Sequence, residues 1–480
     1  MTSRRGAFRW APLVALGAGW LLLAQVLAQP APDAWPAPSQ LDPEAIDYSP
    51  PEPREARLHN GMIVYLLEDR TLPLVRGVAY VRAPSLYDPT EKAGLAAMTA
   101  ALLREGGAGS VSADEMDIRL EQSAASVEAR ADSVLAAVTF DTLSDTLAEV
   151  LPLWRDVLVD PRFETERVEV HRRRQLEAIR RVVDDPVQLA LREFFYRVAE
   201  GHPSGTYPTE DTVAGITRDD LIAFHESYYG PANTVIALAG DFDGDEMLAT
   251  LEELLGNWQA VVDSPPELPA FEGDPGPKVY LVAKDIGQSV VVIGHPAVHA
   301  YTAEYNDLDV ANHILGGGGF NSWLFEEIRT RRGLAYATAS VLTQGFDYPG
   351  VFVAYSISPA QATAQVVELI LDQMERLRDQ GVAPAELERA RETILNQSLF
   401  RYTSAASIAQ RAARVRLLGL DPGYYEHYLA NLQEITVAEI QQVAREELHP
   451  DRAVIMVVGD PQQFDRSPEE FGEVVTIELE

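Results

Sequence analysis

Apolar and polar positions along this chain follow two different periods, which predict short strands separated by amphipathic helices. Strand-like apolar patterns occur in four segments: Met62–Leu67, Leu74–Arg82, Lys278–Val282 and Ser289–His295. Each pair of strands is followed by a segment with helical periodicity, Glu91–Glu105 in the first case and Tyr305–Leu315 in the second. Elements of this length in alternation predict an α+β fold in which helices pack against sheets.

The second half of the chain repeats the pattern of the first. A helical stretch at Arg218–Tyr229 precedes the apolar run Thr234–Asp241, and Val437–Leu448 likewise precedes Ala453–Asp460. The two copies are offset by 219 residues, from position 218 to position 437. This period is too long for a solenoid, so it indicates a duplicated domain.

The N-terminus has the features of a secretory signal peptide. Arg4, Arg5 and Arg9 precede the apolar run Ala11–Leu27, and small residues follow at its end. We therefore predict that residues 1–28 are removed by cleavage after Ala28 and that the mature protein is periplasmic or secreted. A retained membrane anchor is the alternative, although about 17 apolar residues are few for a bilayer core of ~30 Å.

Two proline-rich segments mark the predicted domain boundaries. Residues 29–57 contain eight prolines and few large apolar side chains, which is typical of an extended leader. Residues 261–278 contain five prolines and divide the mature chain almost evenly. We therefore predict a first domain at 58–260, a linker at 261–278 and a second domain at 279–475.

Composition excludes several classes of function. The chain contains no cysteine, so disulfides, thiol chemistry and Cys-ligated metals are excluded. Its formal charge is −34, and removal of the predicted signal, with three arginines and no acids, makes it −37. A negative field of this size repels nucleic acids and anionic lipid surfaces. We therefore expect neither a nucleic-acid partner nor stable membrane insertion of the mature chain.

Motifs spread over most of the chain carry a resemblance to one family. They are Leu58–Leu66, Ala93–Gly107, Gly201–Gly205, Tyr228–Asn233 and Ala239–Phe242. From Leu58 to Asp460 the chain resembles the M16 (insulinase-like) peptidases, which include pitrilysin and the mitochondrial processing peptidase. The resemblance implies two homologous domains, each a mainly antiparallel sheet with helices packed on it.

The metal ligands of that family are missing from the matching positions. In catalytic M16 members one helix carries His-x-x-Glu-His, in which two imidazoles bind zinc and the Glu activates water, and a later helix adds a Glu ligand. The residues in register here are Ala97, Ala100, Ala101 and Ala178. Alanine offers no lone pair, so the resemblance implies that this chain binds no zinc. Glu177, beside Ala178, could mimic one ligand, but one carboxylate does not make a site.

The second half keeps the motif with which the family binds substrate. The stretch Ile314–Tyr336 resembles the family's glycine-rich turn and the helix after it. In the family an Arg and a Tyr seven residues apart reach the substrate held at the zinc, and Arg329 and Tyr336 have this spacing. Their guanidinium and phenol groups could donate hydrogen bonds to a peptide carbonyl as it gains negative charge. Alternatively, Arg329 simply pairs with Glu326 or another acid, and Tyr336 packs at the start of a strand.

The resemblance also implies substrate contacts from the turn itself. These contacts are expected from Gly316, Gly317, Gly318, Gly319, Phe320 and Asn321. Trp323 departs from the basic residue expected in the family at that point. Elsewhere, His295 and His299 have the spacing of a helical metal pair, but Pro296 and the preceding apolar run place them at the end of a strand. That spacing does not converge in a strand, so no metal pair is expected.

Loss of the ligands in one half and retention of the Arg–Tyr pair in the other resembles the two-subunit M16 enzymes. We predict a non-catalytic, substrate-binding subunit of a heterodimeric zinc metalloendopeptidase that degrades or processes peptides in the cell envelope. The chain would be inactive alone and hold no cofactor, while a homologous His-x-x-Glu-His subunit would hold the zinc. The main alternative is a structural or binding protein without peptidase activity, as in core subunits of the respiratory cytochrome bc1 complex. A homodimer and an autonomous protease are further alternatives.

Overall fold

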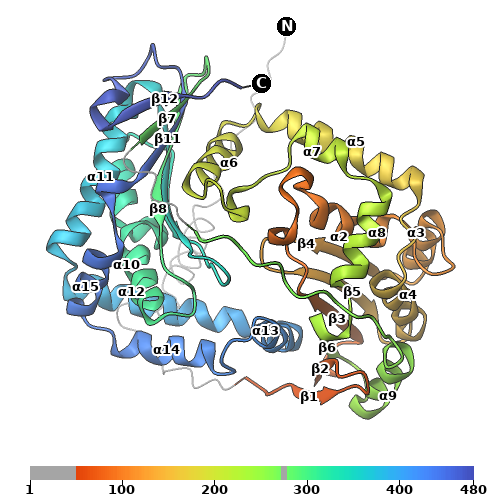
Figure 1. Ribbon diagram of the computed structural model, residues 1–480. Helices are drawn as coiled ribbons and strands as arrows, with labels where there is room; N and C mark the ends of the chain where they lie inside the picture. The colour runs from red at the N-terminus through yellow and green to blue at the C-terminus, as the bar shows by residue number, and fades with distance from the viewer. Residues whose placement is uncertain (1–49, 272–277, 480) are drawn as a thin grey trace, which may run out of the picture. The chain divides into compact units, whose positions relative to one another are not determined.

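The computed structural model describes residues 50–271 and 278–479, which form two six-stranded sheets with helices packed on them (Figure 1). The predicted signal peptide and most of the predicted leader therefore lie outside the described residues. Within the described ranges, no helix is both long and apolar enough to cross a membrane.

The first sheet has the strand order β1-β2-β6-β3-β5-β4. Its strands are β1 (Arg54–Arg57), β2 (Ile63–Glu68), β3 (Leu74–Val81), β4 (Ser126–Ala131), β5 (Ala136–Leu143) and β6 (Thr234–Gly240). The helices of this half are α2 (Leu95–Glu105), α3 (Ala113–Gln122), α4 (Leu147–Val159), α5 (Thr165–Val182), α6 (Pro186–Val198), α7 (Glu210–Gly215), α8 (Arg218–Tyr228) and α9 (Gly244–Leu255). Helices α2 and α4 pack on this sheet, and α8 packs on α2.

The second sheet has the strand order β12-β7-β11-β8-β10-β9. Its strands are β7 (Lys278–Ala283), β8 (Gln288–Pro296), β9 (Ala337–Leu342), β10 (Val351–Pro359), β11 (Val454–Gly459) and β12 (Glu473–Thr476). The helices are α10 (Ala303–Asn312), α11 (Thr363–Gln380), α12 (Pro384–Leu399), α13 (Ala405–Leu417), α14 (Tyr424–Glu434) and α15 (Val437–Glu447). Figure 1 shows α10, α11 and α15 along one face of this sheet.

The duplication predicted from sequence is visible in the strand orders. Strands β2, β6, β3, β5 and β4 of the first sheet correspond in order to β7, β11, β8, β10 and β9 of the second. The central pairs β2/β6 and β7/β11 are parallel, and most other neighbours are antiparallel. The prediction of an α+β fold with two mainly antiparallel sheets is therefore confirmed. The outermost strands differ, because β1 pairs antiparallel with β2 whereas β12 pairs parallel with β7.

Element boundaries depart from the sequence pattern at two informative places. Strand β1 lies inside the segment predicted as leader, so the chain joins the first sheet before Leu58. The helix predicted to run through Leu315 is α-helical only to Asn312 and continues as a π-helical turn over His313–Gly317. A second π-helical stretch covers Phe325–Arg331. Such widened turns are frequent at functional sites, and both lie in the glycine-rich region.

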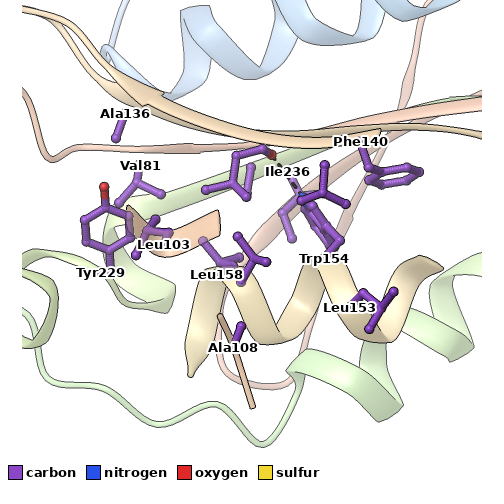
Figure 2. Close-up of a cluster of buried hydrophobic side chains, with 14 of the residues drawn as sticks. Val81, Leu103, Ala108, Ala136, Phe140, Leu153, Trp154, Leu158, Tyr229 and Ile236 are labelled. Carbon is purple, nitrogen blue, oxygen red and sulfur yellow. Dashed lines mark hydrogen bonds between the residues drawn. The ribbon is translucent and has the colours of Figure 1, made fainter. Parts of the chain in front are cut away.

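The core of the first half is built around Trp154 of α4. Its indole is fully buried and meets the ring of Phe140 edge-on, with the centroids 5.3 Å apart (Figure 2). The indole Nε1–H donates a hydrogen bond to the backbone carbonyl of Val138 at 3.0 Å. The large apolar ring is thus buried while its N–H group keeps a hydrogen-bond partner. A buried N–H group without a partner would destabilise the fold.

Each sheet also receives a helix from the other half of the chain. Ile408, Ala409 and Ala413 of α13 belong to one buried cluster with side chains of the first sheet such as Val78. In the same way, residues Leu189–Val198 of α6 join a cluster with buried valines and Tyr280 of the second sheet. Both faces of each sheet are therefore covered by apolar packing, which explains why the central strands β6 and β11 are buried throughout.

Candidate functional site

Helix α2, which matches the metal-binding helix of the M16 peptidases, begins at a glycine that its turn requires. Gly94 has a left-handed φ of +101°, a conformation that side-chain-bearing residues rarely adopt. The carboxylate of Asp88 accepts hydrogen bonds from the backbone N–H of Gly94 at 2.9 Å and of Ala96 at 2.8 Å. Burial raises the pKa of Asp88 to about 7, against the lowering effect of these N–H groups. The start of the helix is therefore tightly fixed.

The three alanines that the resemblance assigns to the ligand positions all lie on α2. Ala97 and Ala101 are one turn apart and half-buried, and Ala100 is buried. Ala178 is exposed on α5, which packs against α2, and it borders a surface hollow of about 440 Å³. Neighbouring Glu177 is bound by Arg181 at 3.0 Å, so the one carboxylate that could mimic a ligand is already engaged.

A histidine and a glutamate do meet on these two helices, one turn or more from the alanines. His171 of α5 hydrogen-bonds through Nδ1 to the Glu105 carboxylate at 3.1 Å, and this bond holds the pKa of Glu105 below its usual value. Arg174 approaches the same carboxylate at 3.6 Å. This pair has no signal in the sequence, because the two residues are distant in the chain and no motif joins them.

The side chains present do not fit a zinc ion. Zinc in peptidases takes three protein ligands and leaves a fourth position for water, whereas His171 and Glu105 supply two and the alanines none. In residues 50–271 and 278–479, no group of three or more His, Cys, Asp or Glu side chains converges as metal ligands do.

The glycines of the second half serve two different structural purposes. A Cβ added to Gly316 would lie 2.4 Å from the backbone nitrogen of Ser340, so only glycine lets the turn approach β9. Gly319 instead has a left-handed φ of +62° and no other heavy atom within 4 Å of its Cβ position. Its carbonyl accepts a hydrogen bond from the Ser322 hydroxyl at 2.7 Å. The turn is thus anchored at one end and open at the other.

Arg329 and Tyr336, predicted from their spacing, are brought together by the fold. The guanidinium carbon of Arg329 lies 5.6 Å from the centre of the Tyr336 ring and 4.7 Å from that of Phe325. Phe325 in turn contacts the predicted substrate residue Phe320 edge-on, with centroids 4.8 Å apart. The rings of Tyr336 and Phe320 are 76% and 74% exposed. A cation and three aromatic rings therefore form one accessible patch.

The simpler explanation of the Arg–Tyr spacing is wrong. Glu326 pairs with Arg331 at 3.2 Å and not with Arg329. Within the described part of the chain, Arg329 makes no ion pair at all, and Tyr336 is exposed rather than packed. The contribution of Phe325 was not predicted, although its position four residues before Arg329 on a helix-like segment was a usable signal.

Trp323 points away from this patch and into the second half's own packing. It is 7% exposed, and its Nε1–H donates to the Glu386 carboxylate at 2.8 Å. The guanidinium of Arg376 stacks 3.7 Å from the indole centre. The departure from the family's basic residue is therefore accommodated by α11 and α12, and it leaves Asn321 exposed at the turn.

The His295–His299 spacing has a structural explanation. His295 is 2% exposed at the end of β8, and its Nδ1 hydrogen-bonds to the Pro296 carbonyl at 2.7 Å. Its Nε2 accepts the backbone N–H of His449 at 3.1 Å. Burial lowers its pKa to about 4, so the ring is neutral and both nitrogens are used within the fold.

Two known families match successive parts of the chain. Residues 65–205 match the family described as insulinase (peptidase family M16), and residues 215–394 match the peptidase M16 inactive domain. Similar sequences include an uncharacterised zinc protease of Mycobacterium leprae, 30% identical over 64% of this chain and 69% of the relative. An uncharacterised zinc protease of Streptomyces coelicolor is 27% identical over 65% of this chain and 70% of its own length.

Solved structures share the fold over most of the chain. A peptidase M16 inactive domain from Pseudomonas fluorescens is 24% identical with a TM-score of 0.74, covering 85% of this chain and 98% of its own. A protease from Helicobacter pylori is 20% identical with a TM-score of 0.76, covering 85% and 99%. A chain of complex III2 from Candida albicans is 17% identical with a TM-score of 0.69, covering 85% and 96%. Together with the sequence relatives, these matches establish that the chain belongs to the M16 (insulinase) peptidase family.

Proposed function

We propose that this chain is the non-catalytic, substrate-binding subunit of a heterodimeric M16 zinc metalloendopeptidase of the cell envelope. The observation that carries the proposal is the asymmetry between the halves. The positions of α2 at which the resemblance implies ligands hold Ala97, Ala100 and Ala101. In contrast, Arg329 makes no ion pair within the described residues and lies beside an exposed Tyr336. A homologous subunit with His-x-x-Glu-His would supply the zinc.

The chemistry of the pair suits a peptide held at another subunit's metal. Arg329 carries guanidinium donors that no acid in the described residues occupies. The Tyr336 hydroxyl is able to donate a hydrogen bond, and its side chain is exposed. Donors fixed in advance can stabilise the negative charge that develops on the carbonyl oxygen during peptide cleavage. The open backbone at Gly319 and the ring of Phe320 would hold the adjoining peptide.

The test uses the intact complex purified with its partner. Arg329→Ala combined with Tyr336→Phe is expected to lower kcat/KM for peptide cleavage by about two orders of magnitude or more, as removal of one oxyanion donor does elsewhere. Arg331→Ala with Tyr301→Phe is the matched control, since it removes a neighbouring ion-paired arginine and another exposed tyrosine. Full activity of the first double variant, in a complex that still assembles, would contradict the proposal.

The rival function is a structural subunit without peptidase activity, for which the shared fold of the complex III2 chain is the relevant observation. Copurification distinguishes the two. A zinc-bearing M16 partner supports the peptidase subunit, whereas a homodimer or a non-peptidase assembly supports the rival. Export is part of the proposal and has its own test: the mature protein recovered from the envelope should begin at Gln29 by mass spectrometry.

A further inference from the structure

A buried pair of polar side chains lies beneath the glycine-rich turn. Asn312 is the last residue of α10, and Ser340 lies within β9. The two residues are only 7% and 1% exposed. The Ser340 hydroxyl donates a hydrogen bond to Oδ1 of Asn312 at 2.6 Å and lies 3.4 Å from the Asn312 backbone oxygen. The pair therefore links the helix that leads into the turn to the strand beside it.

Two successive glycines of the turn lie against this pair. A Cβ on Gly316 would be 2.4 Å from the Ser340 hydroxyl oxygen, and a Cβ on Gly317 would be 3.0 Å from Nδ2 of Asn312. Without side chains at these two positions, the backbone of the turn rests directly on the two polar groups. Gly316 is buried and Gly317 is exposed, so the pair lies at the point where the turn leaves the interior.

The turn depends on such support, because its own backbone is irregular. His313–Gly317 forms a single π-helical turn, and Gly319 follows with a left-handed φ of +62°. Rare conformations of this kind persist where the surrounding structure imposes them. At its far end the turn is held by Ser322, which is 1% exposed and whose hydroxyl donates to the Gly319 carbonyl at 2.7 Å. The exposed tip therefore lies between two buried anchor points.

The pair also connects the two parts of the exposed aromatic patch. Phe320 belongs to the turn, whereas Tyr336 directly precedes β9, four residues before Ser340. The strand is fixed independently, because it pairs with β10 from Ala337 to Leu342. Loss of the pair is therefore expected to shift the turn rather than the strand, and so to change the distance between Phe320 and Tyr336.

We propose that Asn312 and Ser340 are positioning residues, which hold the glycine-rich turn on β9 in the shape that receives a peptide. This inference rests on the proposed substrate-binding role of the turn. Both side chains act through the backbone of Gly316 and Gly317. A hydrogen bond shielded from water is strong, and a buried acceptor that loses its donor is destabilising, so removal of either side chain loosens the turn.

Hydrogen exchange on the purified chain, without a partner, tests the structural step. Asn312→Ala and Ser340→Ala should each make the backbone amides of residues 313–319 exchange about tenfold faster, because each substitution removes the buried hydrogen bond. Ser340→Ala removes a single oxygen atom and keeps the test valid if Asn312→Ala does not fold. Thr142→Val is the matched control, since it removes a buried hydroxyl that hydrogen-bonds to Thr146 at 2.9 Å in the first domain. Unchanged exchange in the two variants, or an equal increase in the control, would overturn the proposal.

Kinetics of the complex purified with its partner test the functional step. With an internally quenched peptide that the parent complex cleaves, Asn312→Ala and Ser340→Ala should each raise KM by about tenfold and change kcat by less than about twofold. The reason is that the turn contributes binding, whereas the groups at the scissile carbonyl stay in place. The double variant should show no larger loss than the more severe single variant, because the two side chains act as one unit. An unchanged KM, or losses that multiply in the double variant, would contradict the proposal.

The outcomes separate this proposal from the proposed function. If Arg329→Ala with Tyr336→Phe keeps full activity while Asn312→Ala raises KM, the role of the Arg–Tyr pair is wrong and the positioning role stands. If that double variant loses activity while Asn312→Ala and Ser340→Ala both match the parent, only the positioning role is wrong.

Discussion

Acidification is expected to destabilise the second domain through one buried histidine. His295 uses both ring nitrogens in its neutral form: Nδ1–H donates to the Pro296 carbonyl, and Nε2 accepts the His449 backbone N–H. A second proton would turn Nε2 into a donor facing another donor. Arg452 and His449 also lie close enough to oppose a positive charge, and Asp451 only partly offsets them.

The size and sign of the effect follow from the two pKa values. The imidazole titrates near 6.5 in the unfolded chain and near 4 in the folded one. Between these values the unfolded chain binds a proton that the folded chain does not, so stability is complete above pH ~6.5 and falls as the pH drops toward ~4. A difference of about 2.5 units corresponds to about 3 kcal/mol of unfolding free energy lost over this window.

Urea unfolding at several values between about pH 7.5 and about pH 4 measures the slope. His295→Gln removes the titrating group while keeping a hydrogen-bond donor and an acceptor. Between pH ~6.5 and ~4, the unfolding free energy of the variant should therefore fall by about 3 kcal/mol less than that of the parent. His427→Gln, whose imidazole is 70% exposed, is the control and should leave the slope unchanged. Identical slopes for the parent and His295→Gln would refute the reasoning.

Three further predictions concern the glycine-rich region and the metal. Gly316→Ala should lower the free energy of unfolding by about 1–3 kcal/mol, because its Cβ would clash with the Ser340 backbone. Gly319→Ala should lower it by about 1–2 kcal/mol from its left-handed φ alone. Urea unfolding checks both variants, and stabilities equal to that of the parent would contradict the predictions. Trp323→Ala should lower the free energy of unfolding by about 3–5 kcal/mol, since the substitution removes both the buried ring and its hydrogen bond to Glu386. A thermal midpoint within a degree or so of the parent would refute this. The purified chain should contain far less than one zinc per molecule, and chelator treatment should leave its melting temperature unchanged; stoichiometric zinc by elemental analysis would contradict the prediction.

Much of the fold was predictable because its signals are local. The apolar runs that became β2, β3, β7 and β8 were located to within a residue or two at most ends, since buried strands need continuous or alternating apolar side chains. The repeat offset correctly indicated two copies of one domain. Strand β1 was not predicted, because Arg54–Arg57 is a charged edge segment whose pairing partner alone makes it a strand.

The residues of the candidate site remain predictions from the sequence, and their surroundings could not be predicted from it. The resemblance assigned roles to Ala97, Ala178, Arg329 and Tyr336, and the residues themselves exclude metal binding at the alanines. Spacing could not decide whether Arg329 was paired or free. The structure decided it, because Glu326 turns to Arg331 and Phe325 comes under the guanidinium instead.

The sequence by itself determined the elements and the duplication, because propensity and period are properties of residues and their neighbours. Only the tertiary structure decided which helices cover which sheet. α6 and α13 each pack on the sheet of the other half, and this choice depends on which apolar faces remain uncovered once both sheets exist. The freedom of Arg329 was decided in the same way, by which acids the surrounding turns brought within reach and which they did not.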